Sequence, residues 1–418
     1  MTIDAPITIG EPILRWSARA HSIAEIESEL ARIWSGQDLT ATVDGEPGRH
    51  VSARTSVMNF VVVARRPELA ERCASTMQSL TGRHPSRTIV IHAADPDGPS
   101  WLDARVEAHC IVPREGAPET CAETILVTCG GEAGLHLAAI ATPLIVHDLP
   151  VTVWWPGEPP LGRRPARELL EGADRLVVDA STWSGDGLAR LRELADLVET
   201  TDLAVSDFAL VRQSRWREAI ASIFDDPGFL PYLRSLRRIA VTYSTHDETG
   251  APGTTNMVKP VYHVGWLASR LRLAVVKPLA PLTGNVPAPA RAKGARGGAV
   301  RPTLSRGVGA TLSDGRGEVA VIVRPIASPT PPGTTLRVEL LAERRGSELR
   351  ADVTAQAESV HVRVWQDGVE AMERHFRAPR RVDVDLLAEA IESGRRDPVA
   401  VGALRSAAAL IGPHWSGS

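Results

Sequence analysis

The sequence predicts an α/β protein, α+β overall, in which mixed, largely parallel sheets are covered by helices and a smaller antiparallel sheet follows toward the C-terminus. Two observations carry this prediction. A strand buried on both faces, an amphipathic helix and a second buried strand follow one another between Arg54 and Ala93, and this order is a βαβ unit, whose strands run parallel. After Leu312, several segments alternate apolar and polar residues between turn-forming residues, which is typical of antiparallel strands.

The elements expected in the first half of the chain follow from the spacing of apolar residues. Ile23, Ile26, Leu30 and Ile33 recur at helical spacing, which predicts an amphipathic helix at 21–34. The elements expected next are a strand at 54–64, a helix at 67–82, a strand at 87–93, an antiparallel pair at 104–112 and 121–129, a nearly all-apolar helix at 135–146 and a strand at 151–155.

The second half continues the α/β alternation and then changes to strands. A helix expected at 205–224 has Ser206 or Asp207 to cap it, since both side chains can accept from the free N–H groups of a helix start. The other expected elements are a strand at 175–181, a helix at 186–199, further α/β elements at 237–244 and 264–276, strands between 318 and 376, and a closing helix at 383–412 that breaks near Gly394 and Pro398.

A chain of 418 residues is longer than one hydrophobic core usually supports, so we expect more than one domain. The segment from Pro281 to Leu312 holds five basic residues and no acidic residue among many Pro, Gly and Ala, which predicts a mobile linker or loop. The expected boundaries are a helical extension at 1–50, an α/β domain at 51–160, a second α/β domain at 161–280, the linker at 281–312, and a sheet with a terminal helix, packed with the second domain, at 313–418.

Composition and charge argue against several classes of partner. The formal net charge of −3 gives no basic footprint for nucleic acid or an anionic membrane. The longest apolar run, residues 135–146, is too short to span a bilayer, and the first residues carry no signal-peptide pattern. The four cysteines show neither C-x-x-C spacing nor zinc spacing with His. We therefore expect a cytoplasmic protein with reduced thiols, no metal and no cofactor.

One glycine-rich turn is a candidate anion site. Gly130, Gly131 and Gly134 lie between an expected strand and an expected helix, where free N–H groups can hold an anion. Their spacing matches neither G-x-G-x-x-G nor the Walker loop. A plain tight turn is the alternative, because short glycine clusters are common at such joints.

The expected strand at 104–112 has two different faces. Arg105, Glu107 and His109 form one face, which is either a solvated surface of an antiparallel pair or a polar surface for a partner. On the other face Cys110 lies nearly opposite Cys121 when both strands are counted out from their loop, and cross-strand neighbours have Cβ atoms about 5 Å apart. A redox role for this pair stays open beside the role of Cys as a small apolar side chain.

Eight stretches resemble, in the same order, the glucose-6-phosphate dehydrogenase assembly protein family, OpcA. The most specific of them is D-L-P-x-x-x-W-W-x-G-E-P-P at 148–160. The resemblance covers about residues 54–273 and no motif after Pro281. The stretches are RTSVMNFVVVA, HPSRTIVIHA, ARVEAHC, CAETILV, PLIVHDLPVTVWWPGEPP, ADRLVVDAS, SDFALVRQSRWREAIASIFD and GWLASRL.

The resemblance implies a protein without catalytic residues that binds glucose-6-phosphate dehydrogenase and promotes its assembly or activation. This agrees with the sequence, in which no nucleophile, metal or phosphate motif is complete. The alternative is an enzyme subunit that binds a sugar phosphate or nucleotide at the GGEAG turn and the carboxyl end of the Trp-Trp strand, because open α/β sheets bind ligands at that edge.

The Trp-Trp segment is the expected partner surface. Side chains alternate along a strand, so Trp154 and Trp155 face opposite sides and at least one of them is core. Gly157 and Glu158 follow on a loop stiffened by prolines at the carboxyl edge of the sheet. We expect this loop and the two Trp residues, together with the polar face of the strand at 104–112, to contact the dehydrogenase.

Overall fold

The computed structural model describes the chain in two compact units and confirms the α/β class. Unit 1 comprises Met1–Asp179, Thr201–Ser206 and Val382–Arg395, and unit 2 comprises the rest. The domain boundaries expected from the sequence stay predictions, and most of the expected linker lies outside the described residues. The structure describes residues 10–35, 41–43, 46–48, 53–54, 56–95, 97–112, 114, 120–246, 254–282, 307–394, 396–413 and 415.

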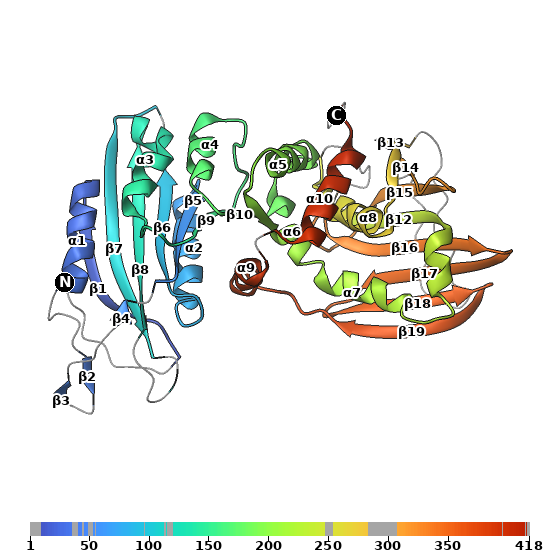
Figure 1. Ribbon diagram of the computed structural model, residues 1–418, viewed down its shortest axis with the longest axis horizontal. Helices are drawn as coiled ribbons and strands as arrows, with labels where there is room; N and C mark the ends of the chain where they lie inside the picture. The colour runs from blue at the N-terminus through green and yellow to red at the C-terminus, as the bar shows by residue number, and fades with distance from the viewer. Residues whose placement is uncertain are drawn as a thin grey trace. The chain divides into compact units, whose positions relative to one another are not determined.

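Unit 1 is built on a nine-stranded mixed sheet (Figure 1). Its strand order is β1-β7-β8-β6-β5-β9-β10-β11, with β4 beside β8. The neighbours from β8 to β10 pair parallel, whereas β7 pairs antiparallel with both β1 and β8. The bounds are β1 Ile13–Ala20, β4 Ala53–Arg54, β5 Met58–Ala64, β6 Ser86–Ala93, β7 Trp101–Ile111, β8 Thr120–Gly130, β9 Val151–Trp155, β10 Arg175–Val178 and β11 Ala204–Asp207. A separate pair joins β2 (Ala41–Val43) to β3 (Glu46–Gly48).

The order of the six strands from β8 to β11 has a consequence for function. Numbered along the chain, β8-β6-β5-β9-β10-β11 reads 3-2-1-4-5-6, the order of a doubly wound dinucleotide-binding sheet. Residues 59–64 of β5 are all buried, as a central strand covered on both faces requires. The direction of winding reverses between β5 and β9, so the carboxyl ends of these two strands mark the switch point.

Helices cover both faces of the sheet in unit 1. Trp34 of α1 bonds Glu123, and Glu71 of α2 bonds Arg105. Arg105 lies opposite Leu126 in the ladder, so it projects from the other face than Glu123 does. α1 and α2 therefore lie on opposite faces. The helices of unit 1 are α1 Ile23–Ser35, α2 Pro67–Ser79, η1 Gly131–Leu135, α3 Leu137–Ala141, η2 Thr142–Leu144, α4 Arg164–Glu171 and α9 Asp383–Glu392, where η denotes a 3-10 helix.

Unit 2 contains an eight-stranded sheet with helices packed against it (Figure 1). Its order is β13-β14-β15-β12-β16-β17-β18-β19, and only β12 and β15 pair parallel. The strands are β12 Leu236–Thr245, β13 Ala274–Pro281, β14 Val308–Ser313, β15 Glu318–Ala327, β16 Thr335–Arg344, β17 Ser347–Ala355, β18 Ser359–Gln366 and β19 Val369–Arg377. The helices are η3 Ala180–Thr182, α5 Leu188–Thr200, α6 Phe208–Val211, α7 Ser214–Ile223, η4 Leu230–Ser235, α8 Val258–Leu271 and α10 Pro398–Ile411.

Two local features organise the helices of unit 2. Asp207 caps α6, because its Oδ1 accepts from the N–H groups of Ala209 and Ala180, while its Oδ2 accepts from the Tyr262 hydroxyl at 2.8 Å. Gly265 lets α8 approach α10 closely, since a Cβ there would lie 2.7 Å from the carbonyl oxygen of Ala403. One of the two caps expected from the sequence, Asp207, is thus confirmed.

Several elements differ from expectation for physical reasons. β1 was not predicted, and β12 and β13 join the antiparallel strands, so the C-terminal sheet is not small. The helix expected at 135–146 is broken into α3 and η2, because Pro143 has no N–H to continue α3. The helix expected at 205–224 divides into β11, α6 and α7. None of the described helices combines the length and apolar character that a bilayer crossing requires.

Candidate functional site

The switch point of unit 1 lacks the residues that hold a dinucleotide. β5 ends at Ala64 and α2 begins at Pro67, so only Arg65 and Arg66 form the turn, and both are exposed. In the dinucleotide-binding fold this turn carries glycines, which let the backbone approach the pyrophosphate. Two arginines followed by a proline replace them here, and a close backbone approach to a phosphate is not available.

The opposite side of the switch point is formed by the loop after β9. The Nη2 of Arg65 donates to the carbonyl oxygen of Glu158 at 3.2 Å, so the two carboxyl ends are joined across the switch point. A Cβ built on Gly157 meets nothing within 4 Å, so this side of the loop is open. Of the expected partner-binding residues, Gly157 and Glu158 lie together here with Arg65 and Arg66.

Trp154 and Trp155 lie beneath this loop in the core. Their side chains are 2% and 3% exposed. Trp154 pairs with Val62 of β5 on one side and Val177 of β10 on the other. The expectation that the Trp pair contacts a partner is therefore corrected, because a strand in the middle of a covered sheet has no free face. Both rings support the loop from below.

The glycine-rich turn is explained by packing, and the anion interpretation is wrong in its premise. Gly131 has φ +60°, and a Cβ there would lie 2.6 Å from the carbonyl oxygen of Gly98. A Cβ on Gly130 would overlap the indole of Trp101, and one on Gly134 would lie 3.1 Å from the Cβ of Ala93. The turn leads into η1 and α3 of five residues each, so no long helix presents its N-terminus to an anion.

The polar face of β7 is buried on the side of the sheet that α2 occupies. The Nη2 of Arg105 donates to Glu71 of α2 at 2.9 Å, and its Nε lies 2.6 Å from Glu107. Glu107 and His109 are 6% and 8% exposed, and the His109 Nε2 lies 3.9 Å from Glu107. The solvated face and the partner surface expected for Arg105, Glu107 and His109 are both corrected, because α2 covers this side of the sheet.

Burial sets the protonation of these groups. Removal from water raises the pKa of Glu107 against the opposing effect of Arg105. The same burial, with Arg105 nearby, lowers the pKa of His109 to about 4. His109 is consequently neutral near pH 7, and the group acts as an internal ion pair with a neutral imidazole beside it.

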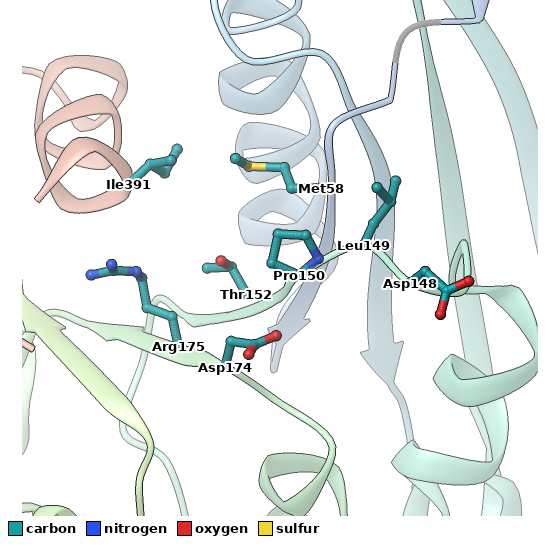
Figure 2. A pocket seen from close by; sticks show the side chains of 8 residues that line it. All are labelled: Met58, Asp148, Leu149, Pro150, Thr152, Asp174, Arg175 and Ile391. Atoms are coloured by element: carbon teal, nitrogen blue, oxygen red, sulfur yellow. The ribbon is translucent and has the colours of Figure 1, made fainter. Parts of the chain in front are cut away.

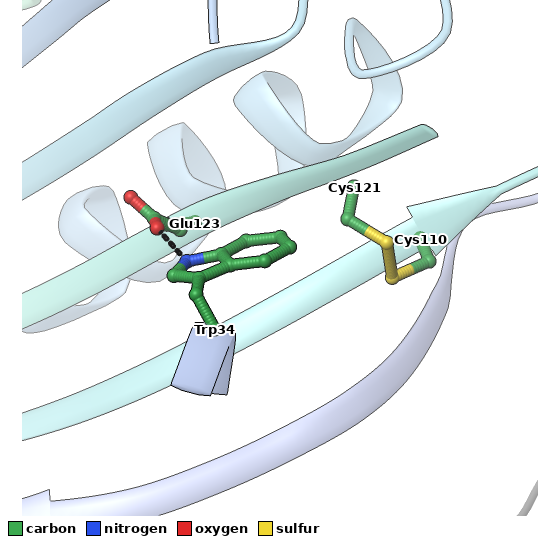
Figure 3. The surroundings of a disulfide bond; sticks show 4 residues. All are labelled: Trp34, Cys110, Cys121 and Glu123. Atoms are coloured by element: carbon green, nitrogen blue, oxygen red, sulfur yellow. Dashed lines mark hydrogen bonds between the residues drawn. A yellow bond between two sulfur atoms is a disulfide. The ribbon is translucent and has the colours of Figure 1, made fainter. Parts of the chain in front are cut away.

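Cys110 and Cys121 form a disulfide, which corrects the expectation that all four thiols are reduced (Figure 3). The two residues are directly opposite in the β7–β8 ladder, as the count from their loop predicts, and their Cα atoms are 4.0 Å apart. Cys73 and Cys129 are free and buried. Burial raises the pKa of Cys73 to about 12 and that of Cys129 to about 11, so neither is a ready thiolate.

A buried polar cluster lies beside the disulfide, and sequence reasoning missed it. The Trp34 indole donates to one carboxylate oxygen of Glu123, and the Arg87 Nε donates to the other (Figure 3). Glu123 is fully buried, and Arg87 also donates to the carbonyl oxygen of Leu144 at 3.0 Å. The signal was present, because Arg87 and Glu123 interrupt two otherwise apolar strands.

A pocket of about 490 Å³ opens at the amino ends of β5, β9 and β10 (Figure 2). Arg175 donates to the hydroxyls of Ser206 and Ser393 and to the carbonyl oxygens of Ser393 and Gly394, which ties the end of α9 to the sheet. Asp174 accepts from the N–H of Val151 at 2.9 Å. Both charged groups thus have structural partners, and we assign no reaction to this pocket. It is lined by Met58, Asp148, Leu149, Pro150, Thr152, Asp174, Arg175 and Ile391.

Comparison with solved structures finds distant likenesses only. An NAD binding oxidoreductase from Klebsiella pneumoniae is 11% identical with a TM-score of 0.44, over 84% of this chain and 94% of that chain. An oxidoreductase from Sinorhizobium meliloti is 13% identical with a TM-score of 0.40, over 86% of this chain and 91% of that chain. At these TM-scores the likeness carries no argument.

Comparison with protein families and relatives is informative. Residues 77–196 match the glucose-6-phosphate dehydrogenase subunit N-terminal domain, and residues 203–403 match the corresponding C-terminal domain. The OxPP cycle protein OpcA of Synechocystis sp. (strain ATCC 27184 / PCC 6803 / Kazusa) is 27% identical over 197 residues, which are 46% of this chain and 38% of the relative. The match thus spans less than half of the relative's length. With both domain models matched in order, the chain belongs to the OpcA family of glucose-6-phosphate dehydrogenase assembly proteins.

Proposed function

We propose that the chain is a non-catalytic subunit that binds glucose-6-phosphate dehydrogenase in the cytoplasm and promotes its active oligomer. It thereby acts as an allosteric activator and raises NADPH production in the oxidative pentose phosphate pathway. The observation that carries the proposal is the switch point of unit 1. There a dinucleotide-type strand order is kept, while Arg65, Arg66 and Pro67 replace the glycines that would hold a dinucleotide. Family membership supplies the identity of the partner.

The contact surface in this proposal is the loop at the carboxyl edge. Gly157 and Glu158 lie on it, and the exposed Arg65 is bonded to the Glu158 carbonyl oxygen. The two buried Trp rings hold the start of the loop in place. A rigid base under a charged rim suits a protein partner, because charged groups at the rim steer association and set the register of docking.

The alternative, an enzyme subunit that binds a sugar phosphate or nucleotide, has less support. Its two binding elements are the GGEAG turn and the carboxyl end of the Trp-Trp strand. The space around Gly130 and Gly131 is filled by Trp101 and by the backbone of residues 98–99. The carboxyl end of β9 is bridged to the β5 side by Arg65.

Assays of the purified chain, first alone and then mixed, separate the two functions. The chain alone should neither oxidise glucose 6-phosphate nor bind NADP⁺ tightly. Added to the dehydrogenase of the same organism at fixed substrate, it should raise kcat/KM and shift the dehydrogenase to a larger sedimenting species. Tight NADP⁺ binding by the chain alone, with no effect on the dehydrogenase, would favour the enzyme alternative.

A further inference from the structure

The last two strands of the unit 2 sheet bring three metal-ligating side chains together. His361 lies on β18, and Glu373 and His375 lie on β19, the strand at the edge of the sheet (Figure 1). One ligand atom from each residue lies within 4.8 Å of the other two. The proposed function makes no use of this group.

The strand register holds the three side chains on one face. His361 is directly opposite His375, and Arg363 is directly opposite Glu373. Residues two apart on a strand share a face, so Glu373 lies beside His375 and diagonal to His361. The two imidazole rings are stacked with centroids 4.1 Å apart, and the His361 Nε2 lies 2.8 Å from Glu373 Oε1. The backbone ladder therefore places the group, and only side-chain rotations remain.

The chemistry of the three groups fits a zinc ion. Two imidazoles and one carboxylate are a known ligand set for Zn²⁺, which leaves the fourth tetrahedral position open. With bonds of about 2.1 Å, tetrahedral ligand atoms lie about 3.4 Å apart. The atoms of the group are already within 4.8 Å of one another, so rotation about side-chain bonds is enough to close them on one ion.

A second shell is present on the His361 side. The amide nitrogen of Gln356 lies 3.4 Å from the His361 Nδ1, and its amide oxygen accepts from the Ser359 hydroxyl. A flip of this amide would let the Nδ1–H donate to the oxygen and leave Nε2 as the ligand atom, which is how ligating imidazoles are commonly oriented. The nearest cation along β18, Arg363, is bonded to Glu370 at 2.5 Å.

We propose that His361, Glu373 and His375 bind one Zn²⁺ ion, which links the edge strand β19 to β18. The open coordination position faces outward, because Glu373 and His375 are exposed while His361 is largely covered. The ion would strengthen the pairing of a strand that has a neighbour on one side only, and such edge strands are the ones that proteins protect.

Zinc titration of the tag-free, EDTA-treated full chain tests this site. Calorimetry should show one Zn²⁺ per chain. His361→Ala, His375→Ala and Glu373→Gln should each weaken binding by at least about tenfold, and Gln356→Ala by about tenfold, as for second-shell partners. His21→Ala is the matched control, since His21 is an exposed imidazole 3.3 Å from Asp103 in unit 1. Equal affinity in wild type and both ligand-histidine variants would overturn the proposal.

Hydrogen exchange supplies a readout that does not depend on affinity alone. Zinc should slow amide exchange in β18 and β19 of the wild type and leave it unchanged in His375→Ala. Because His375 is exposed, this variant should keep the wild-type circular dichroism. No zinc-dependent protection in wild type under saturating zinc would also overturn the site.

Discussion

Reduction of the Cys110–Cys121 bond should lower the free energy of unfolding by about 3 kcal/mol. The bond joins residues separated by 11 positions, and the loop-entropy relation gives about 3 kcal/mol at 25 °C for a closed loop of this size. The folded state should change little, because β7 and β8 pair over their whole length without the bond. The effect therefore acts mainly through the freedom of the unfolded chain.

Urea unfolding with and without reductant measures this difference, and the Cys110→Ala/Cys121→Ala double variant is the control that should not respond. Alkylation under denaturing conditions should modify only Cys73 and Cys129 in the oxidised protein. Four modified cysteines, or an unfolding midpoint that reductant does not move, would refute the reasoning.

Three further predictions concern stability. Trp154→Ala should destabilise the protein by about 3–5 kcal/mol in thermal or urea melts, the usual cost of emptying a buried aromatic site. Gly265→Ala should cost about 1–3 kcal/mol because its Cβ overlaps the α10 backbone, whereas Gly172→Ala, whose Cβ meets nothing within 4 Å, should not; equal melts for both would be inconsistent with this crossing. Burial lowers the pKa of His263 to about 3 and that of His109 to about 4. The unfolded state, with pKa near 6.5, binds these protons first, so stability should be complete above about pH 6.5 and fall by up to about 1.4 kcal/mol per pH unit for each His as pH drops toward 4; an unchanged slope in His263→Leu would count against it.

Local pattern predicted the elements whose environment is simple. β5 and β6 are runs of apolar, β-branched residues and are buried on both faces. Composition alone therefore identifies them as central strands. The two halves of the closing helix separate at Gly394 and Pro398 as predicted, because these residues stop a helix wherever it packs.

Pairing between distant strands was not predictable in the same way. β12 lies between β15 and β16, which follow it by more than seventy residues. Its alternation of apolar residues is equally compatible with a parallel α/β sheet. Which sheet it joins depends on tertiary packing that the segment itself does not encode.

The candidate sites failed or succeeded for the same reason. The glycine turn was interpreted as an anion site because the sequence does not show that Trp101 fills the space beside Gly130. The Arg65–Glu158 bond joins residues 93 positions apart. Counting out from the turn at Asp367 and Gly368 would place Arg374 opposite His361, but a bulge in β19 shifts the register and brings His375 there.

Activation of glucose-6-phosphate dehydrogenase by paired glycine variants tests the central claim most directly. Gly157→Glu adds a charged side chain to the proposed contact loop, and Gly172→Glu adds the same side chain after α4, before β10 begins. A Cβ meets nothing within 4 Å at either position, so both variants should fold as the wild type does. We predict that wild type and Gly172→Glu raise the activity and the sedimenting size of the dehydrogenase equally, whereas Gly157→Glu needs at least about tenfold more protein, the equivalent of about 1.4 kcal/mol. Equal activation by all three proteins would contradict the loop as the contact surface, and no activation by any of them would contradict the proposed function itself.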